Sequence, residues 1–316
     1  LLESMDITID YFKEDRSGIF MQRSSVPSTM GVTGMLPYAN IGSVKNKGVD
    51  MSVAYSKVIG KDWVLRLNGS LTYAHNEITE IDEPVNVEPY SSRIGHPINS
   101  IIGYVSDGLF TSQEEIDRSP KQSFGNYTVG DIKYKDLNGD GVIDTNDRTM
   151  IGRGLPIHTG GFTNDFEYKG FGINAVLTYQ YGAKMYNQTL VDKVENADMK
   201  YNVDRRIYTD RWRKPGDIAL YKAISEEVYV SEKQQFASEK TYPTSRFVQK
   251  RNELKISSLQ LSYDFFRHDF VKKIGLERIL LRFNANDLFT FSSIDIERGT
   301  SYPFARTFNF SLNVTL

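Results

Sequence analysis

The feature that most constrains the fold is an alternation of apolar and polar residues, with a period of two, along most of the chain. On a β-strand successive side chains point to opposite faces, so this pattern predicts strands with one apolar and one polar face. We therefore expect an all-β, antiparallel protein. The alternating segments lie at 5–11, 49–56, 63–74, 171–181, 259–265, 279–286 and 307–316.

Alternation alone does not tell a soluble β-sandwich from a membrane barrel, because both have two-faced strands. Three features favour a transmembrane barrel. The alternating strands run for about 10–13 residues, near the length that crosses a bilayer at a tilt. The 19 tyrosines and 18 phenylalanines concentrate near strand ends, as in aromatic girdles. Short connections at 59–62 and 167–172 alternate with long polar ones at 14–45, 107–157 and 183–244.

The direction of each strand follows from these connections if the short turns are periplasmic and the long loops external. Strands at 46–58, 158–168 and 252–266 then run inward, while those at 63–76, 171–182 and 278–289 run outward, and the link at 267–277 is periplasmic. A further down-and-up pair within 86–107, turning at Gly95–Pro97, brings the expected total to ten strands.

Composition excludes several classes of function. The 38 basic and 40 acidic residues give a net charge of −2, so no overall field attracts nucleic acid. The absence of cysteine excludes thiol catalysis and disulfides. No run of 18 apolar residues and no signal peptide is present. The alternation begins within a few residues of Leu1, so we expect the native polypeptide to extend further.

No residue set in the sequence indicates catalysis. The four histidines are isolated and lack the spacing of a zinc site or a triad, and no nucleophile elbow or phosphate-binding glycine loop occurs. A basic cluster could bind phosphate but is more typical of a solvated face. We predict that the chain is not an enzyme. The residues concerned are His75, His96, His158 and His268, and Arg205, Arg206, Arg211, Arg213 and Lys214.

One motif predicts a metal site. The stretch DLNGDGVIDTND at 136–147 has oxygen donors at the first, third, fifth, seventh, ninth and twelfth positions and glycine at the sixth, which is the spacing of a calcium loop. Ile143 at the eighth position is expected to pack inward. No exit helix follows, so we expect a structural calcium ion and no sensor role. The predicted ligands are Asp136, Asn138, Asp140, Val142 (through its carbonyl), Asp144 and Asp147.

Trp212 is the one candidate for substrate binding. It lies in 184–216, the only segment with a helical pattern, which ends at Pro215–Gly216. An indole ring there could stack on a sugar or contact a partner protein. The other interpretation is that Trp212 anchors the core of the external loop itself.

Several motifs, in order along the chain, resemble the C-terminal barrel portion of SusC-like TonB-dependent outer-membrane transporters, the SusC/RagA family of Bacteroidota. They are NIGSVKNKGVD (40–50), GDIKYKDLNGDGVIDTNDRTMIGRGLP (130–156), GGFTNDFEYKGF (160–171), RNELKISSLQLSYDF (251–265), ANDLF (285–289) and YPFARTFNFSLNVTL (302–316). The last ends in Leu316, whereas the family's terminal strand usually ends in phenylalanine.

The resemblance implies a place within a larger protein. Such transporters have a 22-strand barrel, an N-terminal plug inside it and a segment pulled by TonB. About ten strands and no plug-like domain or TonB box are expected within 1–316, so the chain would be the C-terminal part of the receptor barrel. A SusD-like lipoprotein would act as the lid. The implied function is import of an oligosaccharide, or less often a peptide, across the bacterial outer membrane, with the apolar strand faces against lipid.

Two other functional classes remain open at this point. The first is a secreted, soluble β-sandwich, stapled by calcium, that binds carbohydrate; it predicts that the apolar faces pack against each other. The second is a porin without energy coupling, which a plug and TonB box elsewhere in the polypeptide would exclude.

Overall fold

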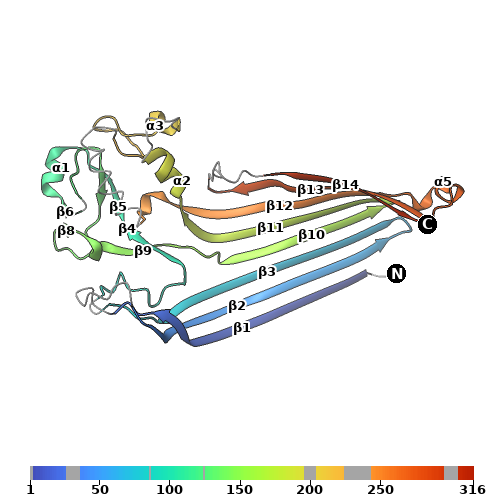
Figure 1. The fold of residues 1–316 in the computed structure, drawn as a ribbon, viewed down its shortest axis with the longest axis horizontal. Coiled ribbons are helices and arrows are strands. Elements are labelled where there is room, and N and C mark those ends of the chain that lie inside the picture. Colours follow the sequence, from blue (N-terminus) through green and yellow to red (C-terminus); the bar gives the residue numbers. More distant parts are fainter. Residues whose placement is uncertain are drawn as a thin grey trace.

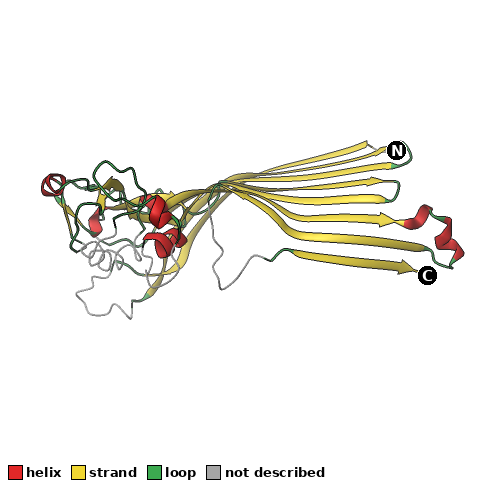
Figure 2. Cartoon of the chain, turned by 90° about the horizontal axis from the view of Figure 1, so that it is seen from above, coloured by secondary structure: helices red, strands yellow, loops and turns green. Residues whose placement is uncertain are grey.

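A single antiparallel sheet dominates the computed structural model, which describes residues 3–25, 36–84, 87–123, 125–195, 204–223, 243–294 and 305–316. Its eight strands follow the order β1-β2-β3-β10-β11-β12-β13-β14, and Figures 1 and 2 show them as one layer. The strands are β1 (Glu3–Gln22), β2 (Tyr38–Ile59), β3 (Trp63–Glu80), β10 (His158–Tyr168), β11 (Phe171–Tyr186), β12 (Val248–Asp264), β13 (Arg278–Ser292) and β14 (Thr307–Thr315).

The connections differ at the two ends of the sheet. At one end, here called the turn end, residues 60–62 and 169–170 form tight turns, and 265–277 form a link. Lys169 and Gly170 both have positive φ (48° and 91°), as a two-residue hairpin turn of type I′ requires. The long connections leave from the opposite end, here called the head end, so the predicted asymmetry is confirmed.

Eight strands, and not ten, form the sheet among the described residues. β3 pairs directly with β10, and the strand pair predicted within 86–107 is wrong. An outward β3 followed by an inward β10 already satisfies the alternation of direction, so no extra pair is needed. The apolar residues of this region instead form β4 (Ser100–Tyr104), which pairs with β9 (Arg148–Arg153) outside the sheet. Five residues are too short to cross a bilayer.

The strands also extend beyond their predicted ends. β1 continues to Gln22 and β2 begins at Tyr38, so the predicted connection 14–45 is partly strand. The added residues include the charged Lys13, Glu14 and Asp15, which hide the apolar alternation. Residues 26–35, 196–203 and 224–242 of the predicted long connections, and 302–304 of the predicted last strand, lie outside the described residues.

The register places most of the apolar residues of the eight strands on one face, here called the apolar face. For example, Ile7, Val53 and Gly69 are successive partners, as are Leu261, Phe283 and Phe310. Many of these side chains are exposed; Ile9 is 63% and Phe310 84% exposed. No second sheet packs on this face within the described residues, so the alternative of a β-sandwich is wrong.

Two aromatic rows border the apolar face. Trp63, Tyr168, Phe171 and Tyr263 are neighbours in register near the turn end, and Tyr11, Tyr73, His158 and Tyr181 lie in a row toward the head end. On β3, Tyr73 follows Trp63 by ten residues (73 − 63 = 10). That separation is about 33 Å along a strand, or about 25 Å in height at a tilt of roughly 40°, which matches the apolar band of an outer-membrane barrel.

The long connections build a compact region, here called the head, at the left of Figure 1. Its described elements bury one apolar core of Tyr104, Ile132, Tyr134, Ile143, Leu190, Val191, Val194, Ile207, Tyr221 and Phe247. No helix among the described residues is long and apolar enough to span a membrane. Besides β4 and β9, the head contains β5 (Ser106–Leu109), α1 (Gln113–Arg118), β6 (Lys121–Gln122), β7 (Ile132–Tyr134), β8 (Val142–Ile143), η2 (Thr145–Asp147), α2 (Gln188–Leu190), η3 (Val191–Glu195), α3 (Arg206–Thr209) and η4 (Ser245–Phe247).

Candidate functional site

The second face of the sheet, here called the polar face, presents amide, hydroxyl and charged side chains. One row of register partners runs Asn174, Gln260, Asn284, Asn309 across four strands. Each amide has both donors and an acceptor. Such a row can hydrogen-bond neutral polar groups of either kind, and it presents no charge to them.

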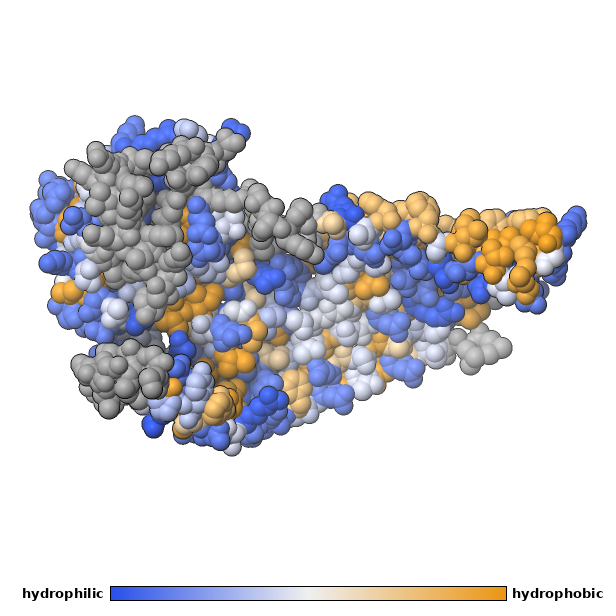
Figure 3. Space-filling view, in the orientation of Figure 1, coloured by the Kyte–Doolittle hydropathy of each residue, from blue (hydrophilic) through white to orange (hydrophobic). Residues whose placement is uncertain are grey.

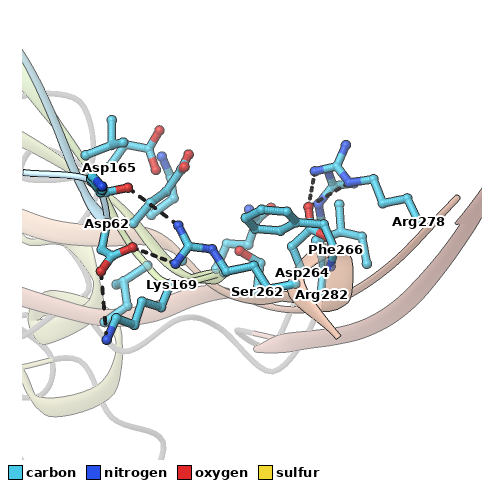
Figure 4. A pocket seen from close by; sticks show the side chains of 18 residues that line it. Asp62, Asp165, Lys169, Ser262, Asp264, Phe266, Arg278 and Arg282 are labelled. Carbon is cyan, nitrogen blue, oxygen red and sulfur yellow. Dashed lines mark hydrogen bonds and ion pairs between the residues drawn. The ribbon is translucent and has the colours of Figure 1, made fainter. Parts of the chain in front are cut away.

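A cavity of about 340 Å³ lies on the polar face near the turn end, and we call it the charged basin (Figure 4). Arg66 contacts Asp165 and Glu167 at 3.0 and 2.9 Å. The lining residues are Lys61, Asp62, Val64, Asp165, Glu167, Lys169, Gly170, Gly172, Ile173, Asn174, Gln260, Ser262, Asp264, Phe266, Arg267, Arg278, Leu280 and Arg282.

Ion pairs across the basin join turns that are far apart in sequence. Arg267 donates to Asp62 at 2.5 Å, which joins the β12–β13 link to the β2–β3 turn. Lys169 lies 3.8 Å from the same carboxylate, and Arg278 donates to Asp264 at 2.6 Å. These ion pairs hold the turns and the link together and make the basin a charged surface.

A partly buried ion pair connects α1 to β7 at the start of the head. Ser112 caps α1, and Glu115 accepts from the Thr111 backbone N–H at 2.8 Å. Lys133 of β7 contacts Glu115 at 2.8 Å and Asp107 at 3.1 Å. The Lys133 ammonium, together with the Thr111 donors, lowers the pKa of Glu115 to about 2.

The predicted calcium loop occupies one edge of the head. Gly141 has a φ of 83° and Ile143 is fully buried, as the motif predicts. The carboxylates accept from loop amides: Asp136 from Gly139 and Gly141, and Asp147 from Leu137 and Asp144. Within the described residues no three acidic or histidine side chains converge as metal ligands.

The carboxylates of this loop act on the neighbouring Tyr90. The Tyr90 hydroxyl donates to the Asn146 carbonyl at 2.8 Å. Burial, and then the negative charges of Glu88, Asp147, Asp136 and Asp140, raise the pKa of Tyr90. The carboxylates that cap the loop therefore make a local negative potential, even though each also has amide donors.

Trp212 lies inside the head and not on an open surface. Its ring packs against Gly130, where an added Cβ would come within 2.5 Å of the indole Cε3. The indole N–H is buried and has no acceptor among the described residues. This geometry fits the interpretation of Trp212 as an anchor of the loop core.

The predicted basic cluster does not form one cationic surface. Arg206 pairs with Asp204 at 2.6 Å, and Arg211 is only 7% exposed and donates to the Val194 and Lys222 carbonyls. The histidines lie apart as well: His75 contacts Arg153, and His268 contacts Tyr263. Their isolation in the sequence is retained in the fold.

Sequence reasoning missed two structural features. Gln122 is 2% exposed, donates to the Ile132 carbonyl and accepts from the Tyr134 N–H, so it joins β6 to β7. No local pattern marks a glutamine for that role. The charged basin was also missed, although the charged residues directly beside the short turns could have indicated it.

The profile of the family described as "TonB dependent receptor-like, beta-barrel" matches residues 2–185. TonB-dependent receptor P39 of Formosa agariphila is 27% identical over 92% of this chain. The TonB-dependent receptor SusC of Bacteroides thetaiotaomicron is 26% identical over 49% of it.

Solved structures agree on the fold. The RagAB peptide transporter matches 92% of this chain with a TM-score of 0.66 at 18% identity, and the open-open state of the RagAB peptide importer gives 0.65 at 19%. This chain spans 30% of the P39 receptor, 16% of SusC and 30% of each RagAB chain. It therefore corresponds to part of a longer polypeptide in each case.

Proposed function

The chain belongs to the family of TonB-dependent receptor-like β-barrels, and from this premise we propose that the full receptor imports an oligosaccharide across the outer membrane. The sheet is a section of an outer-membrane barrel wall, with its apolar face toward lipid. The polar face then faces the lumen, and the head lies on the external side. We assign the chain to the C-terminal part of the barrel, with the plug and the TonB-contacting segment in the rest of the polypeptide.

The observation that carries the proposal is the division between the two faces. The uncharged row Asn174, Gln260, Asn284, Asn309 lies on the polar face. The neighbouring row Ile173, Leu261, Phe283, Phe310 is apolar and lies on the opposite face, where Phe310 is 84% exposed. Amide side chains suit hydroxyl-rich cargo because they can both donate and accept. Because the family consists of TonB-dependent receptors, we assign the chain a role in transport.

Partners follow from the same assignment. A SusD-like lipoprotein would close over the head as a lid, and TonB would supply energy by pulling on the plug. The charged basin, at the end where tight turns meet the periplasm, would face the plug. Arg282 lines the basin and forms no ion pair with another described residue, so the plug would contribute an acceptor there.

A peptide is the second candidate cargo, favoured by the fold similarity to the RagAB peptide transporter. Peptides carry amide groups that the same row could bind. The two cargoes differ in their charged termini, which an oligosaccharide lacks.

Uptake by cells tests the proposal. A strain that lacks the full receptor should lose uptake of a fluorescently labelled oligosaccharide pool and retain uptake of a labelled peptide pool, and the complete receptor should restore it. Loss of peptide uptake alone would select the second cargo. Unchanged uptake of both pools would contradict import by this receptor.

We further propose that the loop at 136–147 binds calcium as a structural ion. The spacing of its oxygen donors and the negative potential at Tyr90 support this. The carboxylates of Asp136, Asp140 and Asp144 would then bind the ion in place of the N–H donors that they now accept from. The bound ion would order the segment 130–156 against the head core.

Limited proteolysis of the full receptor tests this proposal. With calcium present, the head should resist cleavage within 130–156; chelation should remove the protection, and so should Asp140→Ala. Glu114→Ala removes an exposed carboxylate from α1; it is the matched control and should leave the calcium-dependent protection unchanged. Cleavage that is the same with calcium and with chelator would exclude a bound ion.

A further inference from the structure

The link between β12 and β13, residues 265–277, is unlike the two tight turns beside it. It contains η5 (Phe265–Arg267) and α5 (Asp269–Lys273) and exposes two large apolar side chains away from the charged basin. Phe270 is 45% and Ile274 59% exposed. Leaving these groups in water costs free energy, so their exposure indicates a surface that another apolar phase covers.

Aromatic contacts fix the link against the apolar face. Tyr263, which lies on that face, has its ring 4.7 Å from Phe265, and its hydroxyl is 2.8 Å from His268 Nε2. Phe270 lies 5.8 Å from Phe265 and 5.9 Å from His268. The exposed Phe270 is therefore continuous with the lipid-facing band and not with the lumen.

An apolar groove of about 370 Å³ begins at the same tyrosine. It lies on the apolar face across β11–β14 and is lined by Phe171, Leu261, Tyr263, Leu281, Phe310 and Leu312, among others. Figure 3 shows apolar side chains gathered at this end of the sheet, around the link and the end of β14. The groove is concave, whereas the rest of a barrel wall presents side chains to lipid as a convex band.

Two cations lie two and three residues after Phe270. Lys272 and Lys273 stand in the last turn of α5, both are exposed, and neither forms an ion pair with another described residue. Arg267 is different, because its guanidinium is bound to Asp62 on the lumen side. The link therefore combines exposed apolar groups with exposed ammonium groups, and Lys273 follows Phe270 by three residues, on the same side of the helix.

We propose that the link and the groove form a binding site for an anionic phospholipid of the periplasmic leaflet. An acyl chain occupies the groove beside Tyr263, Phe270 and Ile274 enter the interface, and Lys272 and Lys273 bind the headgroup phosphate. Continuity with the lipid-facing band argues for a lipid and against a protein partner. The site rests on membership of the barrel family and does not depend on the transported cargo.

Native mass spectrometry of the full receptor, delipidated in detergent and titrated with lipid, tests the site. Phosphatidylglycerol should bind more tightly than phosphatidylcholine with the same chains. Lys272→Gln and Lys273→Gln should each weaken phosphatidylglycerol binding about fivefold, as expected for roughly 1 kcal/mol per cation near a charged headgroup. Lys61→Gln, in the tight turn at the same end, is the matched control and should change nothing.

A second arm separates the headgroup from the chain. Leu281→Trp, which fills the groove, should weaken both lipids, and inorganic phosphate should not compete with phosphatidylglycerol. Equal binding of the two lipids, or equal effects of Lys273→Gln and Lys61→Gln, would overturn the proposal. Competition by phosphate alone would also overturn it, since a simple anion site would then explain the lysines.

Discussion

The sheet and the head are stabilised against different solvents. In the sheet the apolar side chains point outward, and residues such as Ile9 and Phe310 are more than half exposed. In the head the order is reversed, and Phe110, Ile132 and Phe247 are fully buried. One chain therefore contains an apolar exterior, suited to lipid, and an apolar interior, suited to water.

The difference shows what each region requires from its sequence. A lipid-facing sheet needs alternation and closed hydrogen bonding, because the bilayer offers no partners to backbone groups. The head needs close packing between segments that are far apart in the chain, such as Tyr104, Tyr134 and Phe247. Substitutions should therefore act on one region without the other.

Removing a core aromatic of the head should give the greatest destabilisation. Phe247 stacks on Tyr221 at 6.0 Å and is fully buried. Phe247→Ala should cost about 3–5 kcal/mol and open the head to limited proteolysis, while the amount of heat-modifiable barrel in the outer membrane stays unchanged. Tyr208→Ala, at a 64% exposed position, is the control. Loss of the barrel with Phe247→Ala would mean that the two regions fold as one unit.

A charge on the apolar face should give the converse result. Val53 has Ile7 and Gly69 as register partners, near the middle of the apolar band. Val53→Arg should cost about 2–4 kcal/mol in a bilayer and lower the amount of receptor in the outer membrane. Ala54→Arg places the same side chain between Asp6 and Asn68 on the polar face and should be tolerated. Equal losses from both would contradict the assignment of faces.

Acid should act on the head through Glu115, with a smaller effect. Its pKa is lowered from 4.5 to about 2, so its stabilisation is complete above pH 4.5 and is lost as the pH falls through about 2. Its side chain and that of Lys133 are 28% and 21% exposed, so solvent limits the contribution to about 1 kcal/mol. Pepsin cleavage of the head should rise over this range in the wild type.

Glu115→Gln should remove that dependence, because the amide does not titrate. Asp117→Asn, on the same helix, is the control and should keep the wild-type profile. A profile that is the same for wild type and Glu115→Gln would show that another group controls the acid response of the head.

The sheet was largely predictable from the sequence, for a physical reason. Alternation reports only which face a residue occupies, and that is what the bilayer selects. The prediction failed for segments outside the lipid-facing band. The charged residues 13–15 hide the continuation of β1 toward the head end. Ile101 and Ile102 have the apolar character of a spanning strand, but they belong to the short β4. An apolar strand pattern alone does not show whether the strand will contact lipid in the sheet or pack inside the head.

The head was predictable only where a local motif acts. The spacing in 136–147 correctly predicted that Ile143 is buried and that Gly141 has positive φ. Gln122, Trp212 and the Glu115–Lys133 pair depend on segments brought together by tertiary packing. Their roles come from partners that no local window contains.

Cysteine labelling along β2 tests the central claim most directly, since this chain has no cysteine of its own. Single cysteines from position 49 to 56 in the full receptor, in native outer membranes, should react with a water-soluble thiol reagent at 50, 52, 54 and 56. They should be protected at 49, 51, 53 and 55, where the side chains meet lipid. Uniform labelling, or the opposite parity, would contradict a barrel wall with its apolar face in the bilayer.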